Sequence, residues 1–155
     1  NTYKGGVGIT LLPVKGLTVR GYYDHSQKDL VQSTISGFLG YKYKKLVSVG
    51  LEYNYQQNNK FEERQNYGGF SGFVLYRISP EIELFGRYDQ LSSEKLHSSD
   101  IHPWNYINDG SLWLGGIQYI LHKNVRVAAN YRQWNPNDED SDTEKYFFMN
   151  LEFKF

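Results

Sequence analysis

Hydrophobic and polar residues alternate along the last eleven residues of the chain, KYFFMNLEFKF. Counted in twos from the carboxyl end, one side of this stretch carries only large apolar side chains, namely Phe147, Met149, Leu151, Phe153 and Phe155. A period of two predicts a β-strand with one apolar face, because the side chains of a helix repeat every 3.6 residues. Such a strand suits a membrane β-barrel, but it also suits a soluble β-sandwich.

Four further segments share this alternation and superimpose without gaps: LTVRGYYD (17–24), VSVGLEYN (47–54), IELFGRYD (82–89) and VRVAANYR (125–132). Their first, third and fifth positions are aliphatic or glycine, and their second, fourth, sixth and eighth positions are mostly polar or charged. The seventh position is always a tyrosine: Tyr23, Tyr53, Tyr88 or Tyr131. At about 3.3 Å per residue and a tilt of about 40°, the four tyrosines would form one ring near the edge of an apolar band.

Four segments between these are predicted strands that run in the opposite sense: 3–12, 32–43, 68–78 and 111–121. The connections fall into two classes. Tight turns are expected at 13–16, 44–45, 79–80 and 122–124, and longer hydrophilic loops at 25–30, 56–66, 92–110 and 135–144. Short turns at one end and long loops at the other are typical of outer-membrane barrels. We therefore expect an all-β, antiparallel up-and-down transmembrane β-barrel forming one domain over 1–155, with a soluble barrel or sandwich as the alternative.

The composition agrees with a barrel whose interior is polar. Mean hydropathy is negative, yet aromatic residues make up 17% of the chain and tyrosines number 14. A membrane barrel places such residues outside, in girdles at the two interfaces. The longest uncharged run, 110–121, is too short for a spanning helix. The formal net charge of zero argues against a nucleic-acid partner, and the absence of cysteine excludes disulfides and thiolate metal sites.

The predicted strands number nine, and this odd count affects how a barrel can close. In strict alternation the first and last strands run the same way, so an antiparallel barrel cannot close on this set alone. The simplest interpretation is the carboxyl-terminal part of a larger barrel with at least one further strand upstream. Alternatively, the first strand lies outside the wall and eight strands remain, or strands of a partner chain complete the wall.

The closing run SLWLGGIQYILHKNVRVAANYRQW, its acidic loop and KYFFMNLEFKF resemble the last hairpin and terminal strand of bacterial porins, including the phosphate-selective type. The segment LLPVKGLTVRGYYD similarly resembles a porin turn. The resemblance implies a bacterial outer-membrane location, contacts with lipid and lipopolysaccharide, and recognition of the terminal strand by the barrel assembly machinery. It also implies a homotrimer or a larger envelope complex.

If the apolar positions face lipid, the polar positions line the lumen. The predicted pore-lining residues are Arg20, Asp24, Lys42, Glu52, Arg77, Glu83, Arg87, Asp89, Arg126 and Arg132, with Lys4, Glu152 and Lys154 on the same side. Scattered charges with a mild basic excess favour passive diffusion of small polar or anionic solutes. Alternatively, these charges pair across the wall of a barrel that conducts nothing and serves as an anchor or subunit.

The loops offer weaker signals. Loop 92–110 is expected to cap the outer rim with its own aromatic residues, or else to fold into the lumen. His97, Asp100 and His102 match no recognised metal-ligand spacing, and Asp138, Asp140 and Asp142 lack the glycine and the glutamate of a calcium loop. No GxSxG motif is present and all four histidines are expected in loops or turns, so we expect neither an enzyme nor a metal or other cofactor.

Overall fold

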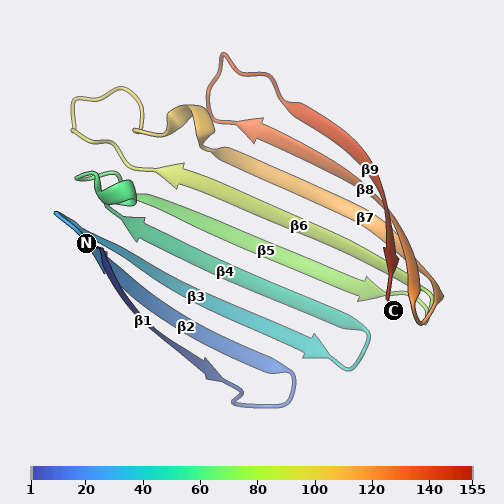
Figure 1. Cartoon of the computed structure of the whole chain (residues 1–155). Coiled ribbons are helices and arrows are strands. Elements are labelled where there is room, and N and C mark those ends of the chain that lie inside the picture. Colours follow the sequence, from blue (N-terminus) through green and yellow to red (C-terminus); the bar gives the residue numbers. More distant parts are fainter. Residues whose placement is uncertain (1, 155) are drawn as a thin grey trace.

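A computed structural model describes residues 2–154, which form one antiparallel sheet in which each strand pairs with the next along the chain (Figure 1). The expected nine-stranded, all-β meander is confirmed. The strands are β1 (Tyr3–Leu11), β2 (Leu17–Gln27), β3 (Val31–Tyr43), β4 (Val47–Gln57), β5 (Tyr67–Arg77), β6 (Ile82–Ser93), β7 (Gly110–His122), β8 (Val125–Pro136) and β9 (Glu144–Phe153). Two short 3₁₀ helices, η1 (Asn59–Phe61) and η2 (Tyr106–Asn108), lie in the long loops.

The register of the strands places the first, third, fifth and seventh positions of all four repeats on one face of the sheet. Tyr23 of β2 pairs with Ile35 of β3, and Leu39 pairs with Leu51 of β4. The pairing continues in the same phase to β9, where Met149 lies opposite Ala129. Directly paired residues share a face, so the alternation seen in each strand becomes one continuous apolar surface across the sheet.

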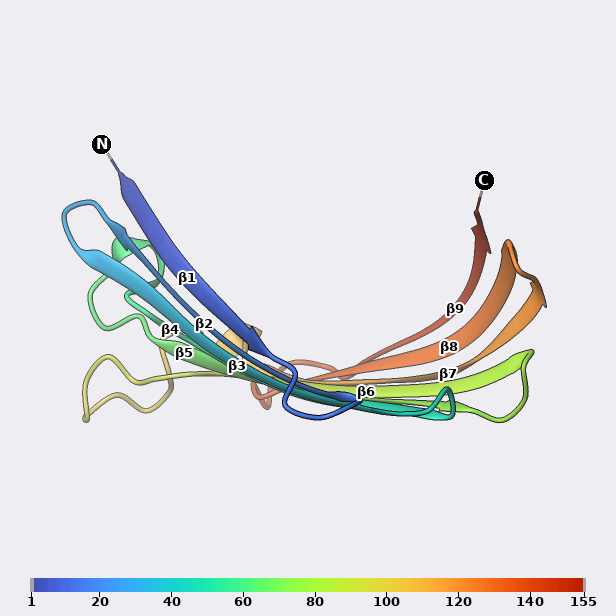
Figure 2. The same ribbon diagram turned by 90° about the horizontal axis from the view of Figure 1, so that it is seen from below.

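The sheet is bent into a trough, with the two chain ends rising on opposite sides of the opening (Figure 2). The polar face lies inside this trough. Asp24, Ser26 and Glu83 are at most 5% exposed and all belong to the polar face. On the other face, a methyl group added to Gly21 or Gly37 would meet no atom within 4 Å. The polar face is therefore concave and crowded, and the apolar face is convex and open.

No hydrophobic side chain is buried anywhere in residues 2–154. Leu51 is 50% exposed and Met149 is 82% exposed, although both lie within strands of the sheet. A soluble sandwich covers such a face with a second sheet, and the described chain supplies none. None of its helices is long and apolar enough to cross a membrane.

The strands reach further toward the long loops than their apolar alternation suggested. Gln57 ends β4 and Ser93 ends β6, so the loops shrink to 28–30, 58–66, 94–109 and 137–143. The backbone ladder continues where the side chains have become polar, because ladder hydrogen bonds do not depend on side-chain polarity. The expectation that all four histidines lie in loops or turns was wrong: His25 lies in β2 and His122 ends β7.

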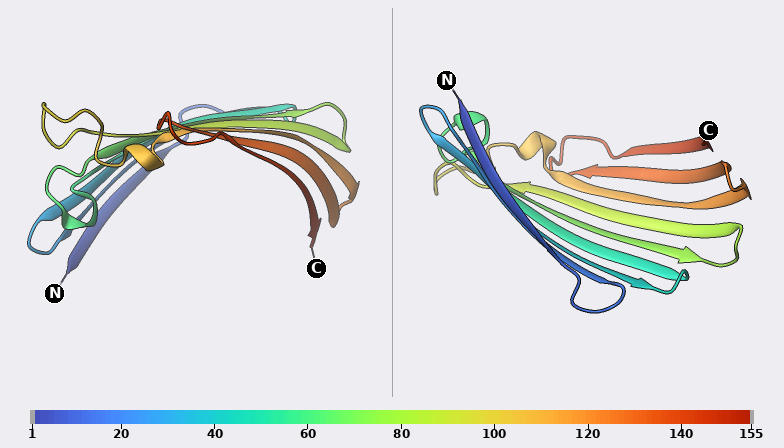
Figure 3. Two further views of the ribbon diagram at one scale, coloured as in Figure 1. Left: turned by 90° about the horizontal axis from the view of Figure 1, so that it is seen from above. Right: turned by 60° about the horizontal axis from the view of Figure 1, so that its bottom comes forward.

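The trough is open along one side. β1 and β9 form the two edges of the sheet and do not pair with each other. They run in the same direction, from the long-loop end toward the short-turn end (Figures 1 and 3). Closing the wall with antiparallel pairs throughout would thus require an odd number of additional strands between them.

Candidate functional site: the concave polar face

The concave face collects the charged residues that the sequence assigned to a lumen. Arg20, Glu52 and Asp89 lie in one row across β2 to β6, connected through their paired neighbours. By the same register the face includes the whole predicted pore-lining set: Arg20, Asp24, Lys42, Glu52, Arg77, Glu83, Arg87, Asp89, Arg126 and Arg132. These side chains therefore share one polar surface that extends from β2 to β8.

Part of this charge is neutralised by pairing. Lys4 Nζ lies 3.4 Å from the nearly buried carboxylate of Asp24. Arg77 donates through Nε to Glu83 at 2.7 Å, and Gln118 donates to the other oxygen of that carboxylate at 2.9 Å. These bonds satisfy a glutamate that is only 3% exposed. A buried carboxylate needs such partners. Part of the charge of the concave face is therefore neutralised by its own residues.

The charge of Asp89 is likewise balanced by groups of its own strand and of the neighbouring strand. Arg87 donates to Asp89 at 2.8 Å, and the hydroxyl of Ser71 on β5 also donates to that carboxylate. The side chain of Arg87 is 55% exposed, so this pair is solvated and contributes little to stability.

Several cations remain without a full partner. Arg20 donates to the hydroxyl of Thr10 at 3.2 Å, and among the described residues Lys42 and Arg132 have no carboxylate within 4.0 Å. Arg126 Nε lies 3.8 Å from Glu152 and is buried without a hydrogen-bond acceptor. The concave face consequently has more positive charge than its own carboxylates compensate.

A hollow of about 460 Å³ opens on this face across β6 to β9. β8 contributes two arginines, Arg126 near its start and Arg132 further along, and Asn130 lies between them in the strand. The rings of Phe85 and Phe148 form apolar parts of the lining. The hollow thus combines hydrogen-bond donors with aromatic surface, a combination suited to a small polar or anionic solute.

The packing of phenylalanine rings against glycines on the concave face was not predicted from the sequence. Phe85 covers Gly116, where an added Cβ would lie 2.6 Å from the ring. In the same way the ring of Phe38 covers Gly40, and Phe73 covers Gly50. The sequence feature that could have indicated this packing is a glycine at a polar-face position of a strand. Such a glycine leaves space for a ring from the same or a neighbouring strand. These rings narrow the trough with apolar rather than charged groups.

At the long-loop rim, two loops are tied together through Glu94. Its carboxylate accepts from the Tyr55 hydroxyl at 2.7 Å and from the Asn66 amide at 3.0 Å. These two hydrogen bonds, with Arg64 nearby, hold the pKa of Glu94 below its ordinary value of 4.5. The indole of Trp104 adds a third link by donating to the Asn66 carbonyl at 2.7 Å.

Loop 94–109 is organised by a buried acid. Asp109 is fully buried and accepts from both the backbone N–H and the hydroxyl of Ser93. The ring of Trp104 packs beside Tyr67, with centroids 6.1 Å apart. The loop caps the rim with its own aromatic residues, and η2 lies over the concave side (Figure 3).

The residues considered for metal binding do not form a common site. His97 lies 3.7 Å from Asp100, but His102 stacks on Tyr106 with centroids 4.2 Å apart. Asp138 accepts hydrogen bonds from the Asp140 backbone and the Ser141 hydroxyl. Within 2–154, no group of three or more ligating side chains is placed to hold an ion.

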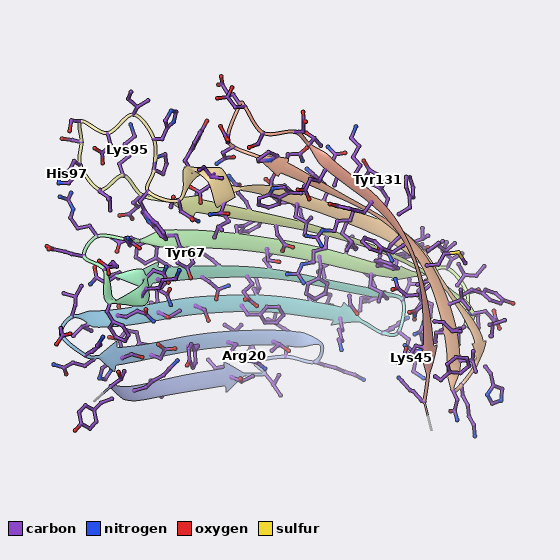
Figure 4. The ribbon with its side chains drawn as sticks, turned by 45° about the horizontal axis from the view of Figure 1, so that its top comes forward. Arg20, Lys45, Tyr67, Lys95, His97 and Tyr131 are labelled. Carbon is purple, nitrogen blue, oxygen red and sulfur yellow. The ribbon has the colours of Figure 1, made fainter. Side chains whose placement is uncertain are left out.

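The convex face carries the aromatic residues expected at a membrane interface. Its four repeat tyrosines lie toward the long-loop end, where Tyr88 contacts Trp113 with centroids 4.5 Å apart and Tyr131 contacts Phe147 at 5.0 Å. Phe147, Met149, Leu151 and Phe153 of β9 are all more than half exposed on this face. Phe155 lies outside the described residues. Figure 4 labels Arg20 and Tyr131, whose side chains belong to opposite faces.

Comparison with known proteins supports this architecture at the level of fold. No protein-family model matches the sequence, and no curated protein is significantly similar to it. Among solved structures, the NanC porin superimposes on this chain with a TM-score of 0.66 at 15% sequence identity, over 100% of this chain and 80% of the porin. The chain therefore has a porin-like β-barrel fold, of which the described sheet forms an open part.

Proposed function

We propose that this protein is a porin-like channel of the bacterial outer membrane, through which small polar or anionic solutes diffuse passively. The observation that carries the proposal is the separation of the two faces of a single curved sheet. The convex face exposes a continuous apolar surface that hydrocarbon would cover, and the concave face exposes charged and amide side chains that water would solvate.

The preference for anions follows from the incompletely paired cations of the concave face. Arg20, Arg126 and Arg132 raise the local concentration of anions in a confined space, and charge rings of this kind bias which ions enter a pore. We do not extend the proposal to phosphate in particular, because most concave-face cations are arginines and the lysines there, Lys4, Lys42 and Lys154, form no continuous row.

In this proposal the apolar convex face contacts lipid, the long loops face lipopolysaccharide and the barrel assembly machinery recognises the exposed apolar side of β9. An odd number of strands between β1 and β9 completes the wall. In this proposal a homotrimer or a larger envelope complex assembles through the convex surface.

The test is a reversal-potential measurement in planar bilayers under a potassium chloride gradient. Wild-type protein should form channels with a mild anion preference. Changing Arg20, Arg126 and Arg132 together to glutamine should shift the reversal potential toward cations, and more strongly at 0.1 M salt, where the Debye length is about 10 Å, than at higher salt. A matched control changes Lys28, Lys60 and Lys95 of the long loops to glutamine and should shift it less. An open channel with unchanged selectivity in the arginine variant would contradict the anion preference.

A second function, a barrel that anchors or assembles an envelope complex without conducting, is favoured by a different observation. Ion pairs such as Arg77–Glu83 and the rings of Phe38, Phe73 and Phe85 already occupy part of the concave face. Absence of channels from correctly inserted wild-type protein would select this function.

A further inference from the structure

Charge is divided unequally between the two rims of the sheet. The short turns carry four lysines, Lys15, Lys44, Lys45 and Lys123, against the single acid Glu81. Two of the loops at the other rim, 94–109 and 137–143, are acidic and contain one lysine. All four short-turn lysines are exposed, and within residues 2–154 none has a carboxylate within 4.0 Å. The short-turn rim is therefore strongly positive.

The same turns, and the adjoining end of β7, expose aliphatic side chains beside these lysines. Leu12 is 73% exposed, Leu46 is 42% exposed and Leu121 is 58% exposed, and each lies within three residues of a short-turn lysine. In water, the exposure of such apolar side chains is unfavourable. At a membrane interface, a lysine can keep its ammonium among headgroups while neighbouring aliphatic groups enter the acyl region.

A tyrosine belt continues from this rim onto the convex face. Tyr43, Tyr76 and Tyr119 lie on that face within a few residues of the short turns and are between 44% and 47% exposed. Tyrosine concentrates at the headgroup level of membranes because its ring is amphipathic. The belt therefore places the short-turn lysines at or just beyond the headgroups.

One of the turns forms a distinct recess with its neighbour. A hollow of about 520 Å³ lies between turns 44–46 and 78–81, lined by Lys45, Leu46, Arg77, Ile78 and Pro80. The Arg77 backbone donates to the Leu46 carbonyl at 2.8 Å and holds the two turns together. Because Glu83 engages the Arg77 guanidinium, Lys45 supplies the free charge. Figure 4 shows Lys45 at this end of the sheet.

We propose that the short-turn rim binds the phosphate groups of anionic phospholipid headgroups, with the acyl chains along the adjacent convex face. Lysine ammonium groups supply the charge for the phosphate, and the recess beside Lys45 supplies an apolar wall for the glycerol and upper acyl carbons. The acidic opposite rim would repel the same lipid. The inference rests on insertion of the apolar face into a bilayer and does not depend on conduction.

The test compares spin-labelled phosphatidylglycerol with spin-labelled phosphatidylcholine in vesicles that contain the protein, by the fraction of each lipid that is motionally restricted. Wild-type protein should prefer phosphatidylglycerol by at least about fivefold, given the attraction of each lysine to an anionic surface. Changing Lys15, Lys44, Lys45 and Lys123 to glutamine should remove this preference. A control with the same loss of charge, Lys28, Lys60, Lys95 and Lys145 to glutamine, should retain it.

The salt dependence of the wild-type lipid preference provides a second test, which needs no variant. At 1 M salt, where the Debye length is about 3 Å, the wild-type preference should largely disappear. Equal restriction of the two lipids by wild-type protein at low salt, or a full preference in the short-turn variant, would overturn the proposal. Conductance of the same preparations separates the two ideas: a retained lipid preference without channels removes the porin function and leaves the lipid site.

Discussion

Gly16 is the residue at which the fold tolerates a side chain least. Its φ is +88°, and an added Cβ would overlap the backbone oxygen of Lys42. We predict that Gly16→Ala lowers the free energy of unfolding by about 2–3 kcal/mol, because the left-handed backbone and the contact with a rigid carbonyl oppose the methyl group together. Gly21→Ala is the control, since its Cβ would meet nothing within 4 Å. Reversible urea unfolding in lipid vesicles measures both, and equal losses would refute the difference.

At this scale, the sequence predicts the face of a residue but not its partner. The alternation at Val19, Arg20 and Gly21 is enough to place each side chain inside or outside the trough. It cannot indicate that Phe85 covers Gly116, because that contact depends on the register between two different strands. Register is set by pairing across strands and by turn geometry, which no single-strand pattern contains.

Each strand, as an element, should respond differently to charge on its two faces. We predict that Leu84→Arg, on the convex face of β6, costs about 2–4 kcal/mol of unfolding free energy in lipid, as a cation near the mid-plane of a barrel exterior does. Arg87→Ala, three positions on and on the concave face, should cost less than about 1 kcal/mol, since its pair with Asp89 is solvated. Similar losses at both positions, measured by the same vesicle assay, would show that the faces are assigned the wrong way round.

The link between loops 58–66 and 94–109 should weaken in acid. Hydrogen bonds from Tyr55 and Asn66 lower the pKa of Glu94 in the folded protein, so their stabilisation is present above its ordinary value of 4.5 and is lost as pH falls through the lowered value. A spin label at Lys60→Cys should therefore become more mobile at low pH. In a Glu94→Gln background the label should already be mobile at neutral pH. If neither the fall in pH nor the Glu94→Gln substitution alters the mobility of the label, Glu94 does not hold the two loops together.

For the whole molecule, the sequence predicts strand number and direction but leaves the closure of the wall open. Nine strands and their hairpin order follow from local alternation and from the lengths of turns and loops. The partners of β1 and β9 do not, because an edge strand presents the same backbone groups to any neighbour.

We predict that β1 and β9 are not adjacent in the inserted protein. When Ile9→Cys and Met149→Cys are combined and oxidised, no intramolecular crosslink should form. β1 and β9 run in the same direction, so in an antiparallel wall at least one further strand must lie between them. The pair Gly21→Cys and Gly37→Cys, directly opposite in β2 and β3, should crosslink readily and serves as the control. A fast crosslink between positions 9 and 149, seen as a mobility shift between reducing and non-reducing gels, would mean that the nine strands close on themselves.

The three tryptophans lie in three different environments, so each can report by its fluorescence on a different part of the protein. Trp113 is 56% exposed on the convex face beside Tyr88, Trp134 lies over Gly110 on the concave face, and Trp104 is held in loop 94–109 by the Asn66 carbonyl. Lipids brominated along their acyl chains should quench the emission of Trp113 alone, whereas aqueous iodide should quench Trp134 and leave Trp113 bright. Single-tryptophan variants, with phenylalanine at the other two positions, would let insertion, wetting of the trough and loop ordering be followed as three separate fluorescence signals during one assembly reaction.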